Sequence, residues 1–428
     1  MNALCRRALG ILVLAVLLGA TAAVQAQVLK QLPADPWVVI KFNNPQNIST
    51  KFAAMAQKLG LANLDPAFSD PLGALKKQLN IQAGVDDKGE LAVAIYAPAE
   101  NETDPRVLAF IPVTDYAAFL KPLPNLKTEG DISTFSLPDE EGEAYAVNRG
   151  SYAVLAVDKE MLAQKPAGVE VGGLAARQLA GNDVTAFVNI KALGAKALPE
   201  LQANRNDIVQ GIDNELAAGD PLQQKFAPAI KAMVNQVLNL AEHTLKEGQA
   251  ATLGLTLVDQ GLNITSTAEF DPSSYLGQTI SSIKNSGNAS FLAGLPNRQY
   301  FVYAAAALDP QVTRKILDDI VPPVRKELEN VPEAKGVVAM IDAARNTLES
   351  IKTLSTGWVV PAEGQKSLVQ QVAVYTGDAK KLQEAQRSYF QALTDLAKLA
   401  PQGPEVQSQI KPDAVTLDGT KLDQVNVQ

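Results

Sequence analysis

The sequence predicts an α+β fold in which antiparallel sheets carry helices packed on one face. Short runs of β-branched and aromatic residues, bounded by turn residues, alternate with longer stretches whose apolar residues recur at helical spacing. A strand, a helix, a second helical stretch, a hairpin and a closing helix follow one another in this order three times. We therefore expect repeated strand-helix-hairpin-helix units at 27–165, 174–281 and 291–428, which are called repeats below.

Each repeat opens with a strand and a helix. Turn residues, such as Leu32-Pro33-Ala34-Asp35 in the first repeat, precede runs rich in Val, Phe, Tyr and Trp, a composition that favours strands. The opening strands are expected at 37–42, 184–190 and 300–305. The helices that follow them are expected at 48–59, from 192 onward and at 310–320.

A second helical stretch follows in each repeat. These stretches are expected at 71–80, at 225–245 and at 323–354, the last with a break near Pro332. The 225–245 stretch has the clearest signal, because its apolar residues recur every three or four positions. The stripe consists of Phe226, Ile230, Met233, Val234, Val237, Ala241 and Leu245. Such a stripe predicts a helix whose apolar side is buried, with Asn235 and Asn239 on the opposite side.

A hairpin and a closing helix complete each repeat. The hairpin strands are expected at 90–97 with 106–113, 252–258 with 262–270, and 357–361 with 368–375. Leu253, Leu255 and Leu257 alternate with small or polar residues, which is the pattern of a half-buried strand. Asp115, Asp271 and Asp378 stand before the closing helices, where a carboxylate can accept bonds from free backbone N–H groups.

Further strands and linkers lie between these elements. A meander is expected at 131–137, 144–148 and 152–158, and a last hairpin at 414–417 and 421–427, where an Asp418-Gly419 turn is a strong hairpin signal. The segments 164–173, 282–290 and 400–409 combine Pro, Gly, Ser and Asn with little apolar periodicity, so they are interpreted as linkers.

Residues 1–26 have the features of a secretory signal peptide. Arg6 and Arg7 form a short positive region, an apolar run extends from Ala8 to Val24, and small residues precede a cleavage site near Ala26. We therefore expect the protein to be exported to the periplasm or the extracellular space. No later segment has 18 consecutive apolar residues, so no transmembrane segment is expected in the mature chain.

The composition argues against several classes of function. The 428 residues include 38 Lys and Arg, 46 Asp and Glu, one His and one Cys, for a net charge of −8. The single Cys5 lies in the signal segment, so the mature chain would contain no cysteine and no disulfide or Cys/His metal site. An acidic chain without basic blocks argues against nucleic acid as a partner. We expect no cofactor, no metal site and no catalytic residue that the sequence can name.

His243 and two serine motifs are the catalytic candidates in the sequence. His243 lies roughly 120° from the centre of the apolar stripe of its helix, so it is expected to be exposed and inert. Ser281-Ser282-Ile283-Lys284 and Ser286-Gly287-Asn288 match two motifs of penicillin-recognising enzymes. They are almost adjacent, they lie in a predicted linker, and no Lys-Thr-Gly follows, so both matches are interpreted as chance.

Two acidic turns were considered as calcium sites. Asp86-Asp87-Lys88-Gly89-Glu90 and Asp139-Glu140-Glu141-Gly142-Glu143 provide several carboxylates in a short loop. Neither has the Asp-x-Asp-x-Asp-Gly spacing of a calcium loop, so both are interpreted as solvated hairpin tips.

Three blocks of the sequence carry a family resemblance. They are the Leu-Pro-Ala-Asp opening after the signal segment, the block 110–120 and the Gly-Ser-Tyr-Ala-Val-Leu block at 150–155. These blocks resemble uncharacterised exported bacterial proteins, a domain of unknown function of the kind abundant in planctomycetes. The resemblance covers 30–165 best. It implies export and a shared fold, and no catalytic residue is carried over from it.

These observations favour a non-catalytic exported protein of the periplasm or cell envelope that acts as a binding or structural module. One concrete version is a carrier of an apolar ligand, because sheets covered by helices can enclose an apolar groove. Two alternatives remain open. One is a carboxylate-dependent hydrolase of envelope polymer, and the other is a protein-interaction subunit of an envelope assembly.

Overall fold

A computed structural model describes residues 27–78, 81, 83–100, 102–137, 142–259, 261–283, 295, 300–359, 370–397, 408–417 and 420–427. The predicted signal peptide therefore lies outside the described residues, as do the Asp418-Gly419 turn and the Ser286-Gly287-Asn288 motif. The chain divides into two compact units. Unit 1 comprises Met1–Leu198 and Thr244–Asp271, and unit 2 comprises Pro199–His243 and Pro272–Gln428.

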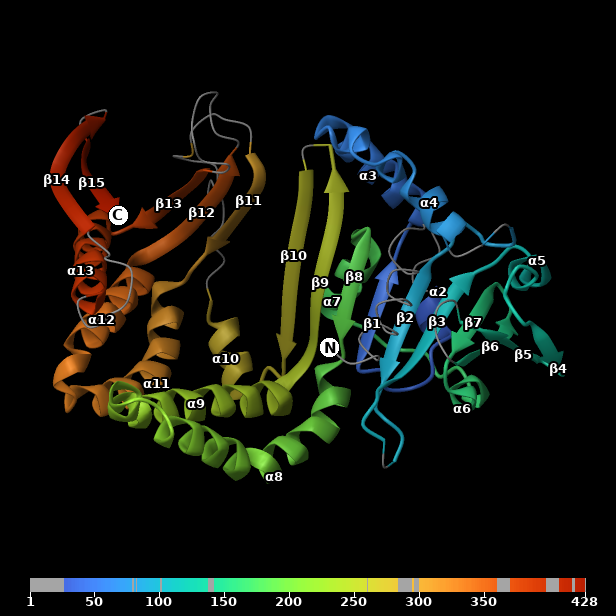
Figure 1. The fold of residues 1–428 in the computed structure, drawn as a ribbon, viewed down its shortest axis with the longest axis horizontal. Helices are drawn as coiled ribbons and strands as arrows, with labels where there is room; N and C mark the ends of the chain where they lie inside the picture. Colours follow the sequence, from blue (N-terminus) through green and yellow to red (C-terminus); the bar gives the residue numbers. More distant parts are fainter. Residues whose placement is uncertain are drawn as a thin grey trace. The chain divides into compact units, whose positions relative to one another are not determined.

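Unit 1 is organised around one ten-stranded antiparallel sheet (Figure 1). Its strands are ordered β10-β9-β8-β1-β2-β3-β7-β6-β5-β4. The strands are β1 (Val38–Phe42), β2 (Leu91–Tyr96), β3 (Arg106–Pro112), β4 (Lys127–Glu129), β5 (Ile132–Ser136), β6 (Glu143–Arg149), β7 (Tyr152–Ala156), β8 (Val184–Val188), β9 (Gly248–Val258) and β10 (Gly261–Phe270). The antiparallel sheets and the mixed composition of helix and strand confirm the predicted α+β class.

Strands of the first two predicted repeats are neighbours in this sheet. Residue Val38 of β1 is opposite Ile95 of β2 on one side and opposite Val188 of β8 on the other. The predicted linker 164–173 lies against the N-terminal helix, because the Val169 N–H donates to the Leu29 carbonyl at 3.0 Å. The strands of 27–165 and 174–281 therefore belong to one sheet, and the threefold repetition itself stays a prediction.

The helices of unit 1 lie on both faces of the sheet, whereas the sequence predicts helices on one face. They are α2 (Gln27–Lys30), α3 (Pro45–Lys58), α4 (Pro71–Gln78), α5 (Tyr116–Leu120), α6 (Lys159–Ala163) and α7 (Gly173–Gly181). On one face α2, α6 and α7 pack against Val39 and Phe110. On the other face α3 and α4 pack against Phe42 and Val93, and α5 against Ile111.

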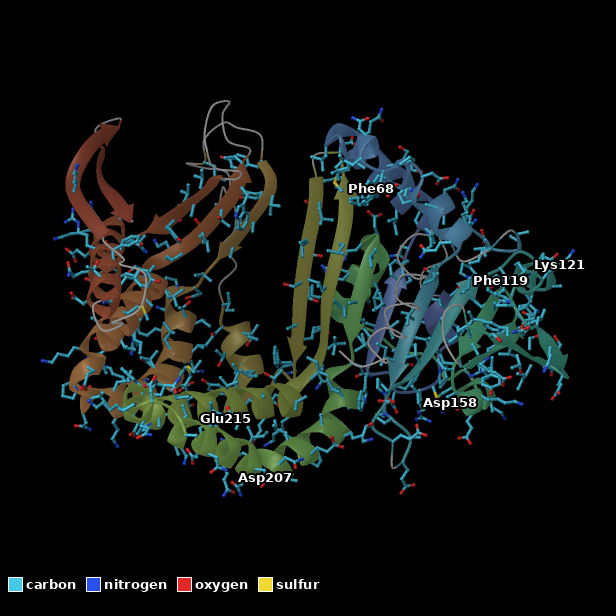
Figure 2. The ribbon with its side chains drawn as sticks, in the orientation of Figure 1. Phe68, Phe119, Lys121, Asp158, Asp207 and Glu215 are labelled. Atoms are coloured by element: carbon cyan, nitrogen blue, oxygen red, sulfur yellow. The ribbon has the colours of Figure 1, made fainter. Side chains whose placement is uncertain are left out.

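The two-sided coverage has a simple cause in the central strands. β2 reads Leu-Ala-Val-Ala-Ile-Tyr and β3 contains Val-Leu-Ala-Phe-Ile, so both alternating sets of side chains are apolar. A strand that is apolar on both faces must be covered on both. The short helices are fixed by their first residues: Asp158, labelled in Figure 2, accepts the Glu160 N–H at 2.8 Å at the start of α6, and Asp115 accepts the Ala118 N–H at 3.0 Å before α5.

Unit 2 contains a smaller sheet, a hairpin and long helices. The sheet is ordered β11-β12-β13, and β14 pairs with β15. The elements are α10 (Tyr275–Ser281), β11 (Tyr300–Ala307), α11 (Pro310–Glu329), α12 (Lys335–Ser350), β12 (Ile351–Val359), β13 (Gln370–Gly377), α13 (Ala379–Ala397), β14 (Ser408–Leu417) and β15 (Thr420–Val427). The break predicted near Pro332 is confirmed, because a short 3-10 turn (Pro332–Ala334) separates α11 from α12.

Two predictions about helix ends and faces need correction. Asp378 caps α13 as expected, but α10 is capped by Ser274, whose hydroxyl accepts the Gly277 N–H at 3.0 Å, and not by Asp271. The second correction concerns the apolar stripe predicted to be buried on the 225–245 helix. This helix is part of α9 (Pro221–Glu247), which pairs with α8 (Ile190–Ala217), and both helices span the boundary between the two units. Met233 and Val237 of the predicted apolar stripe are exposed.

The pairing of α8 with α9 explains this exposure. Arg205 of α8 donates to the side chains of Asn235 and Asn239 and forms an ion pair with Glu242, all on α9. A guanidinium presents several donors in a fixed fork, which suits a set of neighbouring amide and carboxylate oxygens. The polar side of α9 therefore faces α8. No helix among the described residues is both long and apolar enough to cross a membrane.

Candidate functional site

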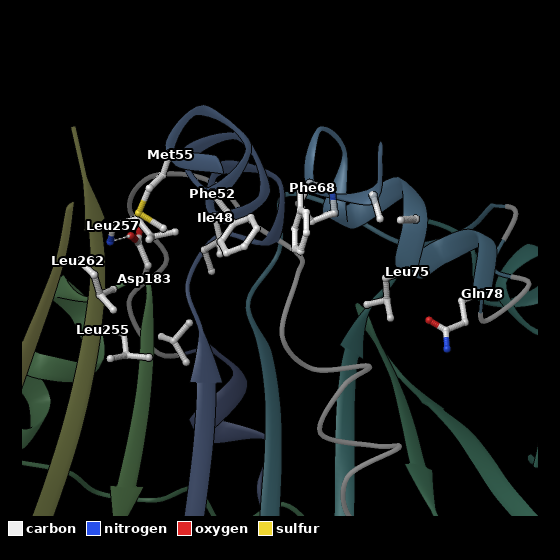
Figure 3. A pocket seen from close by; sticks show the side chains of 14 residues that line it. Ile48, Phe52, Met55, Phe68, Leu75, Gln78, Asp183, Leu255, Leu257 and Leu262 are labelled. Carbon is white, nitrogen blue, oxygen red and sulfur yellow. Dashed lines mark hydrogen bonds between the residues drawn. The ribbon is translucent and has the colours of Figure 1, made fainter. Parts of the chain in front are cut away.

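A cavity of about 500 Å³ lies in unit 1 between the α3–α4 segment and the β8–β10 end of the sheet. Its lining is almost entirely apolar, and its side chains are drawn in Figure 3. The lining residues are Ile48, Phe52, Met55, Ala67, Phe68, Pro71, Ala74, Leu75, Gln78, Asp183, Val184, Leu255, Leu257 and Leu262. This set is called the apolar pocket below. Its volume and lining are typical of sites for small ligands, which span roughly 300–1,000 Å³.

The helical side of the apolar pocket is built by α3 and the turn that follows it. Ile48, Phe52 and Met55 recur at helical spacing, so they share the face of α3 that is turned to the sheet. Asn44 fixes the start of α3 because its side-chain oxygen accepts the Asn47 N–H at 2.5 Å. Pro45 occupies the first turn, where the backbone N–H that proline lacks would have no partner within the helix. Phe68 comes from a 3-10 turn (Pro66–Phe68), and its ring lies 6.1 Å from that of Phe52.

The sheet side of the apolar pocket is built by β8, β9 and β10. Val184 is opposite Leu255, and Leu257 is opposite Leu262, so these side chains share one face. The predicted alternation of Leu253, Leu255 and Leu257 therefore places all three on this face. Leu253 lies outside the lining and is 49% exposed.

The same face continues beyond the apolar pocket. Ile264 is opposite Leu255 and is 63% exposed. The opposite face of this hairpin is polar, with Thr252 and Thr267 bonded to each other, and α7 packs against it. Apolar side chains thus extend from the pocket along the open face of β9 and β10.

Asp183 is the one ionisable side chain in the lining, and its charge is already matched. Its carboxylate lies 2.7 Å and 3.0 Å, oxygen to nitrogen, from the Nζ of Lys51 on α3. Its Oδ2 also accepts the Leu257 N–H at 2.7 Å. Lys58, about two turns further along α3 from Lys51, donates to the Asp259 carbonyl at 2.9 Å. These contacts tie α3 to the sheet across the apolar pocket.

Two further cavities of unit 1 lie beside α2 and α7. The first, of about 600 Å³, is lined by Leu29, Lys41, Val169, Val171, Ala176, Arg177, Leu179, Ala180 and Gly181. The second, of about 520 Å³, is lined by Leu29, Lys30, Val169, Glu170, Val171 and Gly172. Lys41 is buried and pairs with Glu90 at 2.7 Å, and Glu90 also accepts the Val28 N–H at 3.3 Å. Glu90 therefore links α2 to Lys41 of β1, and Lys41 also donates to the Leu179 carbonyl of α7 at 3.2 Å, as part of the core.

His243 is exposed, as the sequence predicts, but it has aromatic and charged neighbours within unit 2. Its ring lies 5.8 Å from that of Tyr275, whose hydroxyl donates to Asp319. Lys315 lies 4.8 Å from the centre of the Tyr275 ring and donates to Thr279 at 3.0 Å. No local sequence pattern predicts this cluster, because its members come from α9, α10 and α11.

The other candidates are not assembled into a site. The Ser281 hydroxyl donates to the Gln278 carbonyl within its own helix, and Lys284 lies outside the described residues. Asp87 pairs with Lys76, and Asp86 accepts the Lys88 N–H within the first acidic turn. Residues 139–141 of the second turn are not among those described. Within the described part of the chain, no group of three or more His, Cys, Asp or Glu side chains could hold a metal ion.

A comparison of the chain with protein-family models, with curated proteins and with solved structures found no significant match. The family resemblance inferred from the sequence therefore stays a prediction, and the function has to be argued from the cavities and their chemistry.

Proposed function

We propose that this protein is a non-catalytic exported binding protein of the periplasm or cell envelope, and that it holds an apolar ligand in the apolar pocket. The observation that carries this proposal is the lining itself. Twelve of its members are apolar side chains, drawn from two helices, a turn and three strands. Burial of apolar surface is the main source of affinity in such a site, at about 25 cal/mol per Å².

The chemistry of the three cavities supports binding over hydrolysis. Glycoside hydrolysis uses two carboxylates roughly 5–10 Å apart. The apolar pocket contains one acid, Asp183, and that acid is engaged by Lys51 and the Leu257 N–H. The cavities beside α2 contribute Glu170 alone. None of these three cavities offers the pair of acids that the hydrolase alternative requires.

Binding can be tested with an uncharged apolar fluorophore, N-phenyl-1-naphthylamine, titrated into the full-length protein. We expect one saturable site per chain. Leu262→Asp should weaken binding at least about tenfold, because it introduces a charge into the lining. The matched control is Leu64→Asp, since Leu64 is 77% exposed and lies outside the lining. No saturable binding, or equal binding by both variants, would overturn the proposal.

The exposed Leu253 and Ile264 allow a second test with linear alcohols of increasing length. If the ligand extends from the pocket along the open face of β9 and β10, each added methylene should strengthen binding about fourfold, equivalent to about 0.8 kcal/mol. An affinity that does not depend on chain length would instead favour the protein-interaction alternative for this face.

Export is supported by the sequence of residues 1–26, and it has its own test. The full chain can be expressed with its N-terminus intact in a Gram-negative bacterium and recovered from the periplasmic fraction. We expect Edman sequencing to begin at or next to Gln27. Recovery of an intact Met1 in the cytoplasmic fraction would contradict this part of the proposal.

A further inference from the structure

We infer that the apolar pocket is selective for an uncharged ligand with a single aliphatic chain, and that it discriminates against an ionised carboxylate of the same length. This inference rests on the proposed function and specifies the class of ligand. It follows from how the polar groups of the pocket are used and from the arrangement of its apolar side chains.

The first step concerns the charge available to a ligand. Asp183 has a side chain that is 10% exposed, and its negative charge is matched by Lys51. Its Oδ2 also takes the Leu257 N–H. A ligand carboxylate could pair with Lys51 only by displacing Asp183, which would leave an acid inside the protein without its cation. Removal of one partner from a buried ion pair is strongly unfavourable.

The second step concerns the opposite charge. The Lys51 side chain is 33% exposed, so it can turn toward water more easily than Asp183 can. A ligand ammonium could therefore take the place of Lys51 beside Asp183 at a smaller cost than a carboxylate would incur. The expected order of affinity is an uncharged end group first, an ammonium second and a carboxylate last.

The third step concerns the charges next to the helical side of the apolar pocket. Asp65 precedes the lining residues of the 3-10 turn and accepts the Ala67 N–H at 2.8 Å. Asp70 precedes the lining residues of α4 and accepts the Gly73 N–H at 3.0 Å. Both acids are exposed, and each is within two residues of a lining residue of the apolar pocket. Lys76 and Lys77 are next to the lining residues Leu75 and Gln78 at the other end of α4, so these charges offset one another and the bias against an anionic ligand rests on the Lys51–Asp183 pair.

The fourth step concerns the shape of the site. In Figure 3, Asp183 and Leu257 lie at one end of the row of lining side chains, and Leu75 and Gln78 lie at the other. The side chains between these ends are apolar. A linear chain fits such a row. The amide of Gln78 is uncharged and can both donate and accept a hydrogen bond, which suits a hydroxyl or ester end group.

The test compares three ligands of equal length: decanol, decylammonium and decanoate. Each displaces N-phenyl-1-naphthylamine from the full-length protein at about pH 8, where a carboxyl group with an ordinary pKa near 4–5 is ionised. We expect decanol to displace the fluorophore at a concentration at least about tenfold lower than decanoate, with decylammonium between them.

The variant Asp183→Asn tests the cause of the selectivity. It removes the negative charge and keeps an oxygen that can accept the Leu257 N–H, so Lys51 is left without its counterion. Decanoate affinity should then rise at least about tenfold, while decanol affinity stays within about twofold. The matched control is Asp87→Asn, which removes a charge from the pair with Lys76, outside the lining, and should leave the ratio unchanged.

The outcomes separate the two proposals. If none of the three ligands nor the fluorophore binds, the proposed function fails. If wild-type protein binds decanoate as tightly as decanol, or more tightly, the proposed function stands and this inference is wrong. The wild-type order of affinities decides the inference even if Asp183→Asn does not fold. If Asp183→Asn folds and the ratio does not change, the role assigned to the Lys51–Asp183 pair is wrong.

Discussion

The hairpins β2–β3 and β9–β10 both present apolar side chains, on two faces in β2–β3 and on one face in β9–β10, but these side chains have opposite environments. In β2 and β3 nearly every side chain is buried, and Ala92, Ala94, Leu108 and Phe110 are fully inaccessible. In β9 and β10, Leu253, Leu262 and Ile264 are all exposed by more than 45%. The first hairpin lies in the middle of the sheet with helices on both faces, whereas β10 is an edge strand. An apolar strand at a poorly covered edge is costly to maintain, which favours a role in binding.

The largest expected effect concerns the centre of the sheet. Phe110 is fully buried, and its ring lies 6.4 Å from that of Tyr152. Phe110→Ala should lower the free energy of unfolding of unit 1 by about 3–5 kcal/mol, because it removes a buried ring and leaves a cavity. Hydrogen exchange of the β2 and β3 amides measures this loss. A loss below about 1 kcal/mol would mean that β2 and β3 are not more tightly packed than β9 and β10.

The ion pairs Lys41–Glu90 and Lys51–Asp183 also differ in burial, as the two hairpins do. Lys41 is 1% exposed in its pair with Glu90, whereas Lys51 is 33% exposed in its pair with Asp183. Lys41→Met should cost about 3 kcal/mol of unfolding free energy, because Glu90 loses its cation within the core. Lys51→Met should cost less than half as much. Urea unfolding of the two variants measures the difference, and the double variant Lys41→Met/Glu90→Gln should recover part of the first loss.

An intermediate effect should appear at alkaline pH. Burial raises the pKa of Tyr96, although the nearby charge of Arg149 acts against it. Burial raises the pKa of Tyr152 as well, and Glu90 and Asp86 add to this. Tyrosine in the unfolded chain loses its proton near pH 10, whereas both folded tyrosines keep theirs. The free energy of unfolding should therefore fall as the pH rises above about 10, by up to about 1.4 kcal/mol per pH unit for each tyrosine.

The variant Tyr152→Phe checks this alkaline loss. Between about pH 9 and pH 11, it should lose about 1 kcal/mol less unfolding free energy than the wild type, because one titrating group is gone. Tyr375→Phe serves as the control, since Tyr375 is exposed, and it should follow the wild-type profile. Identical profiles for wild type and Tyr152→Phe would show that the buried tyrosine does not contribute.

The smallest effect on stability is expected at the open edge. Ile264→Asn should change the free energy of unfolding by less than about 0.5 kcal/mol, because the side chain already faces water. The same variant should weaken the binding of long-chain alcohols and leave short-chain binding unchanged. A large loss of stability in urea unfolding would indicate that the open face of β9 and β10 is packed in solution.

Local sequence patterns predict where the strands of the sheet lie in the chain better than they predict which strands pair with one another. The strands expected at 37–42, 90–97, 252–258 and 262–270 are present, because alternation and turn residues act within a few positions. The pairing of β1 with β8 was not predicted, since Val38 and Val188 are far apart in sequence and nothing local specifies the contact. The coverage of both faces follows from apolar residues at both alternating sets of positions in β2 and β3, so the sequence contains the signal for it.

The apolar pocket shows the same limit. The helix at 48–59 and the alternation of Leu253, Leu255 and Leu257 were both recognised, but their meeting depends on the order of strands across the whole sheet. The exposure of Met233 and Val237 was missed for a related reason. A stripe of apolar residues indicates which side of a helix could be buried, whereas the Arg205 contacts decide which side faces α8.

The division of unit 1 into two sequence segments has a consequence for the order in which the sheet can form. Residues 199–243 belong to unit 2 and precede β9 and β10 in the chain. In a chain that emerges N-terminus first, β8 is the last strand on its side of the sheet until β9 and β10 follow. At that stage Asp183 has Lys51 as a partner but not yet the Leu257 N–H. A chaperone that shields unpaired strands would find its substrate at β8 during this interval.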